Sequence, residues 1–302
     1  MGESDAPLPI SRRELGNEGA VRVFAYRCTA HRGDRPEPER FDKPVISIVQ
    51  SGVFGFRSER PTQLLTRGFL LLGNPGRGYE VSHEHGGGDE CITFRFEEAA
   101  LDELAGGRAR NGDDGWGYFS RSVLPPVPRA DVIRHLTEAR LLGGAPSLGL
   151  EELAFALAAC VLGETGVRRP PKIPPDSRRA RDSVHAALAL LDQSSSEDLH
   201  LEDIAHEVGL SPYHFLRLFK RELGVTPYRY LLQARVRRAV ELLGGTDRPV
   251  TEIAFDVGFG DLSNFINAFR REVGCSPGQF RRYLRGAKMP AGLARLLLGP
   301  TR

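Results

Sequence analysis

Over the first third of the chain, apolar and β-branched residues come in short runs separated by glycine, proline and charged residues. The runs are VRVFAYRCTA, PVISIVQSGVFGFRSE, QLLTRGFLLLGNPG, YEVSHEH and ECITFRFE. Short runs with turn residues between them are typical of antiparallel β-strands. We therefore expect an N-terminal β domain, and the spacing alone allows either a sandwich or a barrel.

Further along, the apolar period becomes helical. ADVIRHLTEARLLGG and GLEELAFALAACVLGE predict helices over about Ala130–Gly143 and Ser147–Gly163, each ending at a glycine. The next segment, GVRRPPKIPPDSRR from Gly166 to Arg179, is rich in proline and arginine and has no apolar period. This composition predicts a linker between two domains.

A degenerate repeat dominates the C-terminal third. DIAHEVGLSPYHFLRLFKRELGVTPYRY, from Asp203, recurs as EIAFDVGFGDLSNFINAFRREVGCSPGQF, from Glu252. The first residues match at a spacing of 49 and, after a one-residue insertion, the later ones match at 50. Two similar units in one chain predict two copies of one structural element.

Each unit has the pattern of a short helix, a turn and a second helix. Gly209 and Gly258 fall where the first helix must end, because glycine tolerates a left-handed backbone. Ser211 followed by Pro212 supplies an N-cap and a first-turn proline. Core positions at helical spacing follow in both second helices: Phe215, Leu218 and Phe219, then Phe265 and Phe269. A repeated helical hairpin with a solvated basic face is the alternative interpretation.

The stretch from about Ser177 to Lys288 resembles the DNA-binding domain of the AraC/XylS family of bacterial transcription regulators. The resemblance includes the signature IAFDVGFGDLSNFINAFRREVGCSPGQFRR. It implies two recognition helices that enter successive major-groove segments of double-stranded DNA. A long helix should join them, and Thr226 as N-cap through about Leu243 supplies it.

The same resemblance assigns contacts by position. Bases should be contacted by Tyr213, His214, Leu216 and Arg217 in the first unit and by Leu262, Ser263, Asn264 and Asn267 in the second. Phosphates should be contacted by Ser211, Lys220, Arg221, Arg270 and Arg271. Arg217 is the strongest candidate, because a guanidinium binds guanine bidentately. Asn267 departs from the family, where arginine is usual, which indicates an adenine contact or a weaker half-site.

Charge supports this assignment once it is localised. The whole chain has 41 basic and 39 acidic side chains, which does not point to nucleic acid. Between Gly209 and Lys288 the sequence has 14 basic side chains and only 7 acidic ones. The basic excess therefore lies in the segment that carries the repeat.

The β runs, placed ahead of this DNA-binding domain, resemble the cupin-like jelly-roll effector domain of the same family. We therefore expect an α+β protein with an N-terminal β jelly roll plus helices and a C-terminal all-α double helix-turn-helix. The expected divisions are an effector domain at 1–128, a helical dimerisation segment at 129–165, a linker at 166–177, the DNA-binding domain at 178–288 and a tail at 289–302.

A cluster of cysteines and histidines in the β region suggests site chemistry. His83 and His85 alternate along an extended segment and share a face, and Cys91 follows after a glycine turn. Cys28 and His31 are expected on a neighbouring strand. Thiol and imidazole ligands of this kind predict a zinc-like divalent metal site at Cys28, His83, His85 and Cys91. A reactive thiol and a plain structural use are the alternatives.

Three functions are compatible with parts of the sequence. A transcription regulator that responds to a small-molecule effector, a metal or a redox signal explains both domains. A cupin metalloenzyme tethered to DNA would need a complete ligand set, and a DNA-repair transferase would need a Pro-Cys-His nucleophile, which the sequence lacks. We therefore expect a regulator and no enzyme, with RNA polymerase and a second copy of the chain as partners.

The location is also predicted from the sequence. Four unpatterned cysteines are typical of a reducing cytoplasm. The polar N-terminus resembles no signal peptide, and no apolar run approaches the length of a membrane span. We expect a cytoplasmic protein without membrane contact.

Overall fold

The structure is a computed structural model of the chain. It describes residues 10–31, 38–58, 62–83, 88–105, 117–143, 148–165, 178–193 and 201–298. By its internal contacts the chain divides into two compact units, Met1–Leu124 and Pro125–Arg302. The helices expected at 129–165 thus group with the helix-turn-helix repeat, whereas the linker expected at 166–177 lies outside the described residues.

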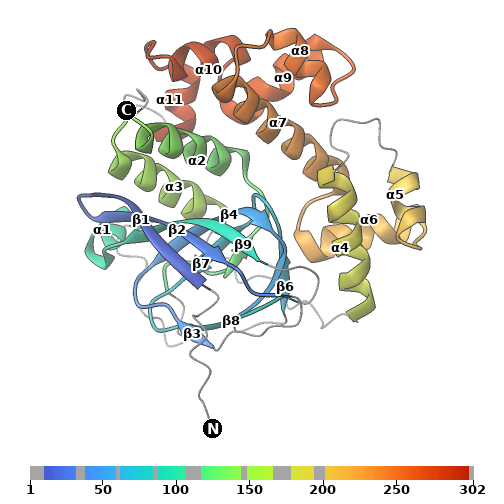
Figure 1. Cartoon of the computed structure of the whole chain (residues 1–302), viewed down its shortest axis with the longest axis horizontal. Helices are drawn as coiled ribbons and strands as arrows, with labels where there is room; N and C mark the ends of the chain where they lie inside the picture. The colour runs from blue at the N-terminus through green and yellow to red at the C-terminus, as the bar shows by residue number, and fades with distance from the viewer. Residues whose placement is uncertain are drawn as a thin grey trace. The chain divides into compact units, whose positions relative to one another are not determined.

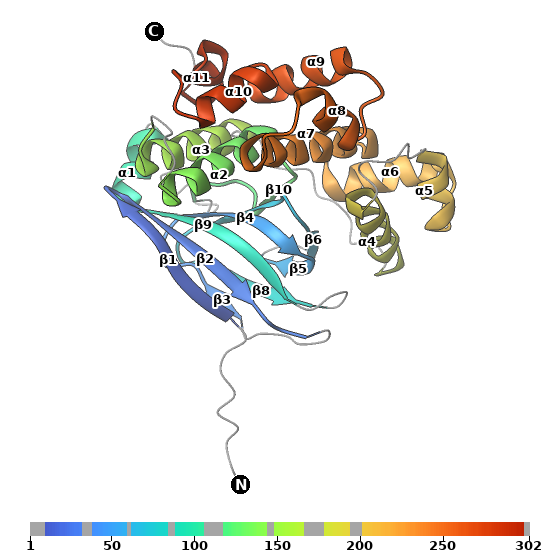
Figure 2. The ribbon, with the colours of Figure 1, turned by 45° about the horizontal axis from the view of Figure 1, so that its top comes forward.

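Two antiparallel sheets form the first unit as a β-sandwich (Figures 1 and 2). One sheet runs in the order β1 (Ile10–Glu18), β2 (Val21–Cys28), β9 (Asp89–Phe96), β4 (Val45–Gly52), β7 (Leu70–Gly73) and β10 (Val123–Leu124). The other runs in the order β3 (Glu39–Arg40), β8 (Gly78–Ser82), β5 (Phe54–Arg57) and β6 (Gln63–Leu65). A short helix, α1 (Glu98–Leu104), follows β9. The expected N-terminal β domain is confirmed.

The core of this unit explains why the central strands are almost wholly apolar. Strand β4 pairs with β9 on one side and β7 on the other, and its residues Val45 to Val49 are all buried. A strand buried on both faces loses the alternation of polar and apolar residues. Ser47 is the one polar residue in this run. Its hydroxyl is hydrogen-bonded to the Thr93 hydroxyl of β9, with 2.8 Å between the two oxygens.

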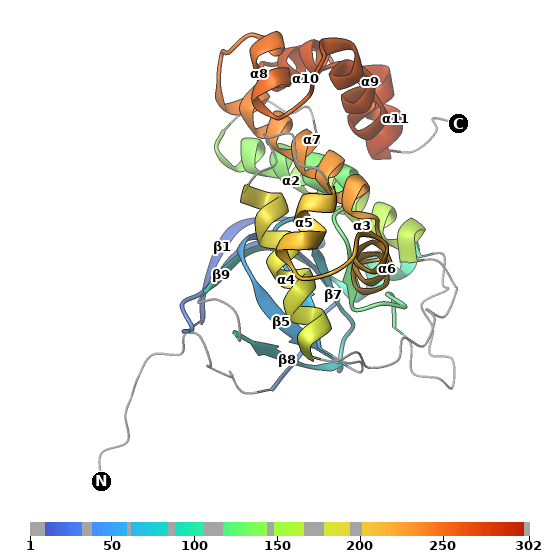
Figure 3. The ribbon, with the colours of Figure 1, turned by 90° about the vertical axis from the view of Figure 1, so that its right-hand side faces the viewer.

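The second unit is helical (Figures 1 and 3). Its helices are α2 (Pro128–Leu141), α3 (Leu150–Thr165), α4 (Arg178–Gln193), α5 (Leu201–Glu207), α6 (Pro212–Leu223), α7 (Pro227–Gly245), α8 (Val250–Asp256), α9 (Leu262–Val273), α10 (Pro277–Leu284) and α11 (Ala291–Leu298). The group α4–α6 lies at the start of α7, and α8–α10 lie at its end (Figure 1). The double helix-turn-helix expected from the repeat is confirmed.

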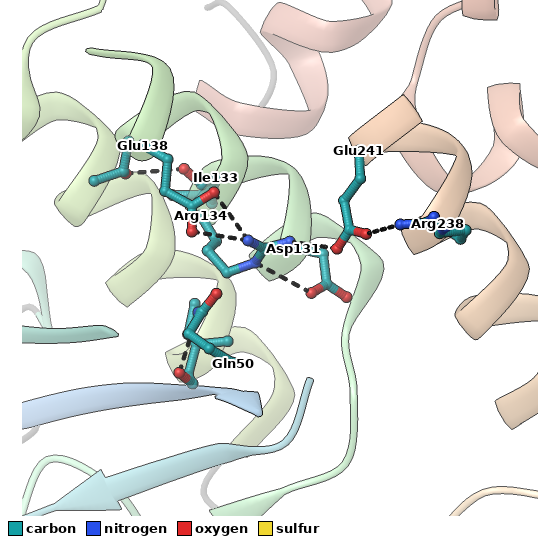
Figure 4. Close-up of polar contacts among 9 residues, drawn as sticks. Gln50, Asp131, Ile133, Arg134, Glu138, Arg238 and Glu241 are labelled. Atoms are coloured by element: carbon teal, nitrogen blue, oxygen red, sulfur yellow. Dashed lines mark hydrogen bonds and ion pairs between the residues drawn. The ribbon is translucent and has the colours of Figure 1, made fainter. Parts of the chain in front are cut away.

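A network of charges around the buried Arg134 joins α2 to α7 (Figure 4). The Arg134 guanidinium donates to both carboxylate oxygens of Glu138, at 2.8 and 3.0 Å, and to Glu241 of α7, at 3.3 Å. Asp131, almost fully buried, lies 3.8 Å from Arg134 and 3.8 Å from Arg237 of α7. Burial lowers the pKa of Arg134, but Asp131, Glu138 and Glu241 outweigh burial and raise it overall. Arg134 therefore stays charged inside this contact.

The segment expected to be a tail, 289–302, contains α11. Leu293 and Leu297 of α11 are buried, and Arg129 of α2 donates to the Leu297 carbonyl at 2.6 Å. At Gly274, which has a φ of 82°, an added Cβ would lie 2.5 Å from the Gly292 carbonyl oxygen. Glycine at both positions thus permits α11 to approach the end of α9 closely.

The pair Gly224 and Gly274 tests this packing. Both glycines are left-handed caps, with φ of 76° and 82°, but only Gly274 lacks space for a side chain. We expect Gly224→Ala to cost about 1–2 kcal/mol of unfolding free energy from backbone strain. Gly274→Ala should cost about 1–3 kcal/mol more because of the clash with Gly292. Urea unfolding of the full chain measures both, and equal losses would contradict the contact between α11 and Gly274.

Asp131 tests the charge network. Asp131→Asn removes a negative charge that balances the buried positive charges of Arg134 and Arg237. The unfolding free energy should therefore fall by about 3–5 kcal/mol. Arg238 also pairs with Glu241, at 3.4 Å, but its side chain is exposed. Arg238→Ala should therefore cost only about 0–1 kcal/mol. Similar losses for the two variants would show that the buried part of the network is not the stabilising part.

Candidate functional site

The recognition helices α6 and α9 begin and end through equivalent caps. The Ser211 hydroxyl accepts a hydrogen bond from the His214 backbone N–H at 3.3 Å, and the Asp261 carboxylate accepts one from Asn264 at 2.7 Å. These caps satisfy amides that the first helical turn leaves without partners. The preceding turns contain Gly209 and Gly258, with φ of 70° and 90°, as the sequence predicted.

The buried faces of the two helices are built alike. Phe215 and Phe219 contact each other edge-on at 5.5 Å between ring centroids, and Phe219 contacts Tyr230 at 5.8 Å. The second unit repeats this chain of rings with Phe265, Phe269 and Phe280: Phe265 and Phe269 lie 5.7 Å apart, and Phe269 and Phe280 lie 5.8 Å apart. These aromatic contacts hold each recognition helix in one rotation about its axis.

The opposite faces carry the residues predicted to contact bases. Of the eight, only Leu262 is half-buried, and the others are exposed: Tyr213, His214, Leu216, Arg217, Ser263, Asn264 and Asn267. Tyr213 is 70% exposed. The Arg217 guanidinium lies 5.7 Å from its ring centroid, a cation–π distance. An aromatic and a guanidinium in contact on an exposed helical face provide a surface for base edges.

The residues predicted to contact phosphates differ in their surroundings. Lys220 and Arg270 are exposed, and Ser211 is already the cap of α6. Arg221 and Arg271 are also exposed, but their Nε atoms lie 3.3 and 3.1 Å from Glu222 and Glu272 respectively. Part of their charge is therefore balanced within the protein, so Lys220 and Arg270 are the better candidates for phosphate contact.

The spacing of the recognition helices is set by α7. With 19 residues at about 1.5 Å each, α7 is about 28 Å long. Arg229, near its start, forms two hydrogen-bonded contacts to the buried Glu272 carboxylate of α9, at 2.9 and 3.0 Å. This bidentate pair holds the second recognition helix, α9, against α7, the helix that follows the first recognition helix, α6.

A second cluster lies in the β unit. Cys28, His83 and Asp89 each offer one ligand atom, and these atoms lie within 4.8 Å of one another. His83 is fully buried, and its Nε2 atom lies 2.9 Å from the Asp89 carboxylate. The Cys91 thiol lies 3.7 Å from the other Asp89 oxygen. Of the predicted metal ligands, His85 lies outside the described residues, and Cys28, His83 and Cys91 surround Asp89.

Strand pairing explains why these residues meet. Cys28 of β2 pairs with Asp89 of β9, and Cys91 lies two residues further on the same face. His83 directly follows β8 of the other sheet. At Gly88, with a φ of 76°, an added Cβ would lie 2.8 Å from the Cys28 carbonyl oxygen. The glycine therefore permits β9 to start this close to the end of β2.

The sequence pattern did not single out Asp89, which directly follows three glycines. In the structure its side chain is only 11% exposed. Burial and the Asp89 carboxylate raise the pKa of the Cys91 thiol well above its usual value. A protonated thiol is a poor nucleophile, so this geometry does not favour a reactive Cys91. His31, expected near Cys28, is exposed and lines a cleft of about 400 Å³ together with Cys28 and Asp89.

The helices expected to form a dimer are largely buried within the chain. Of α3, Leu153, Ala154, Leu157, Ala158 and Val161 are all buried. Helix α2 contacts α3, α7, α9 and α11. These apolar positions of the expected dimerisation segment are thus already covered, and a homodimer stays a prediction.

Comparison with known proteins bears on the C-terminal region. The family described as a helix-turn-helix domain matches residues 204–283. The HTH-type transcriptional activator RhaS of Klebsiella pneumoniae (strain 342) is 39% identical over 99 residues, which are 33% of this chain and 36% of RhaS. The uncharacterized HTH-type transcriptional regulator YfiF of Bacillus subtilis (strain 168) is 32% identical over 120 residues, with shares of 37% and 38%. The chain therefore spans little more than a third of the length of these relatives.

A solved structure is also similar. The crystal structure of a transcriptional regulator from Chromobacterium violaceum, described as containing an AraC-type DNA-binding domain, is 28% identical. It covers 37% of this chain and 100% of its own, with a TM-score of 0.34.

The repeated caps, the paired recognition helices and the family match define the C-terminal region as a helix-turn-helix DNA-binding domain. The match to residues 204–283 confirms the helix-turn-helix part of the resemblance seen in the sequence. Among the described residues, no helix is both long and apolar enough to span a membrane.

Proposed function

We propose that the protein is a sequence-specific transcription regulator whose N-terminal β unit binds an effector. The observation that carries this proposal is the exposed face of α6, where Arg217 lies against Tyr213 beside the exposed Leu216. Large apolar side chains exposed on a helix mark contact surfaces. On a basic helix-turn-helix, the partner that fits is the major groove of double-stranded DNA.

Duplication supports DNA as the partner. Two recognition helices with equivalent caps and equivalent buried aromatics present their exposed faces from one helical unit. A single binding helix would not need the second copy, whereas successive major-groove segments on one face of DNA require two. Contact with RNA polymerase and pairing with a second copy of the chain are further predictions of the AraC resemblance.

The β unit supports the effector part of the proposal. It has its own core of buried strands and a cleft lined by Cys28, His31, Ser51 and Asp89, among others. Concave sites with a few convergent polar groups are where small ligands bind.

Arg217 tests base recognition. Arg217→Ala should weaken binding to the specific DNA site by about 1–3 kcal/mol and relax the preference at one base pair. Arg270→Ala is the matched control, because Arg270 lies exposed at the end of α9 and Arg271 is engaged with Glu272. Arg270→Ala should weaken specific and random DNA alike. Both affinities are measured at one salt concentration, and equal losses on the two DNAs for Arg217→Ala would refute its role in reading a base.

The two units together predict the footprint. One chain should protect two major-groove segments about one helical turn, roughly 34–36 Å, apart on the same face of DNA. Hydroxyl-radical footprinting of the full chain on its site measures this spacing. Arg217→Ala should weaken protection of the first segment more than that of the second. Asn267→Ala should weaken protection of the second segment more. Protection of a single segment by the parent chain would mean that only one helix-turn-helix unit enters the groove.

A further inference from the structure

We infer that Cys28, His83 and Asp89 form a binding site for one soft divalent cation of the zinc class. The three residues come from both sheets of the β unit, and one ligand atom from each lies within 4.8 Å of the other two. A zinc ion bonds to sulfur at about 2.3 Å and to nitrogen or oxygen at about 2.0–2.2 Å, so a small inward movement of the side chains brings all three atoms onto a single ion. This site does not depend on the proposed DNA-binding function.

The geometry of His83 and Asp89 supports a shared ion. The imidazole of His83 is fully buried, and its Nε2 atom lies 2.9 Å from an Asp89 carboxylate oxygen. Neighbouring ligand atoms of one zinc ion lie at about this separation, so Nε2 and the carboxylate can both bind the same ion in place of the hydrogen bond between them.

The charges of the site match a divalent cation. With Cys28 as a thiolate and Asp89 as a carboxylate, two negative charges balance the two positive charges of the metal, and His83 binds as the neutral imidazole. The backbone N–H of Ala30 donates to the Cys28 sulfur at 3.5 Å, which helps to hold the sulfur in place. A buried site without net charge avoids the desolvation cost of a lone ion.

The ligand set also selects the kind of metal. Sulfur and imidazole ligands favour zinc and related transition metals, whereas calcium and magnesium require oxygen ligands alone. The cleft lined by Cys28 and Asp89 opens beside the site and gives the ion a path inward. Three protein ligands leave the fourth position of a tetrahedral ion for a further donor. Cys91 is less well placed, since its thiol contacts Asp89 and is not among the three grouped ligand atoms.

The first test uses the unmodified full chain. After chelator treatment, it should bind one equivalent of Zn²⁺ per chain, measured by equilibrium dialysis against a chromophoric chelator. Binding should release a proton from the Cys28 thiol into a weakly buffered solution. Co²⁺ in place of Zn²⁺ should give a thiolate-to-cobalt charge-transfer band. Less than one equivalent of zinc, or a cobalt complex without that band, would overturn the site whether or not the chain binds DNA.

Variants then test the ligand set. Cys28→Ser and Asp89→Asn should each weaken zinc binding at least ~10-fold, and Cys28→Ser should abolish the cobalt band. Cys160→Ser is the control, because Cys160 is another buried thiol, located in α3. It should keep full affinity and the full band. Circular dichroism verifies that each variant is folded. A larger loss of affinity for Cys91→Ser than for Asp89→Asn would overturn the assignment of Asp89 as a ligand.

Discussion

Burial of two phenylalanines one turn apart on each recognition helix is the constraint on which the DNA-binding surface depends. Phe215 and Phe219 are fully buried, as are Phe265 and Phe269. With 3.6 residues per turn, the position two residues after the first ring of each pair, Arg217 or Asn267, faces away from the core. Removing such a ring would cost about 3–5 kcal/mol, so the helix has little freedom to rotate. The exposure of Arg217 and Asn267 is therefore a consequence of the core.

The same logic extends beyond each helix, because the two units are held by buried charges as well as by rings. Glu272 is buried in α9 and receives both guanidinium contacts from Arg229 of α7. Asp131 places a further buried carboxylate between α2 and α7. Buried charges tolerate few alternative partners, since leaving one uncompensated is costly. These contacts therefore specify how α2, α7 and α9 pack as well as contributing to stability.

Local sequence signals predicted the repeat well, because caps, turn glycines and the aromatic period act within one helical turn. They failed where a structure depends on distant partners. Strand β1 is mostly exposed and lacks apolar alternation, and it forms only by pairing with β2. Helix α11 is too short to be stable alone, and its buried leucines need the surrounding helices. In the sequence, Asp89 is not distinguishable from a solvated charge in a turn. Its role becomes visible only in the structure, where pairing with Cys28 places it beside His83.

The duplicated scaffold carries two different chemistries. At a spacing of 50, Tyr213, His214 and Arg217 correspond to Ser263, Asn264 and Asn267. The first helix thus presents a ring and a guanidinium, and the second presents only neutral polar groups at these positions. A guanidinium binds guanine and also attracts phosphate, whereas an amide binds adenine without adding charge. Because the caps and buried rings of the two helices are equivalent, this difference arises from the exposed side chains alone. The first unit should therefore supply more of the salt-dependent affinity, and the second should contribute mainly through base complementarity.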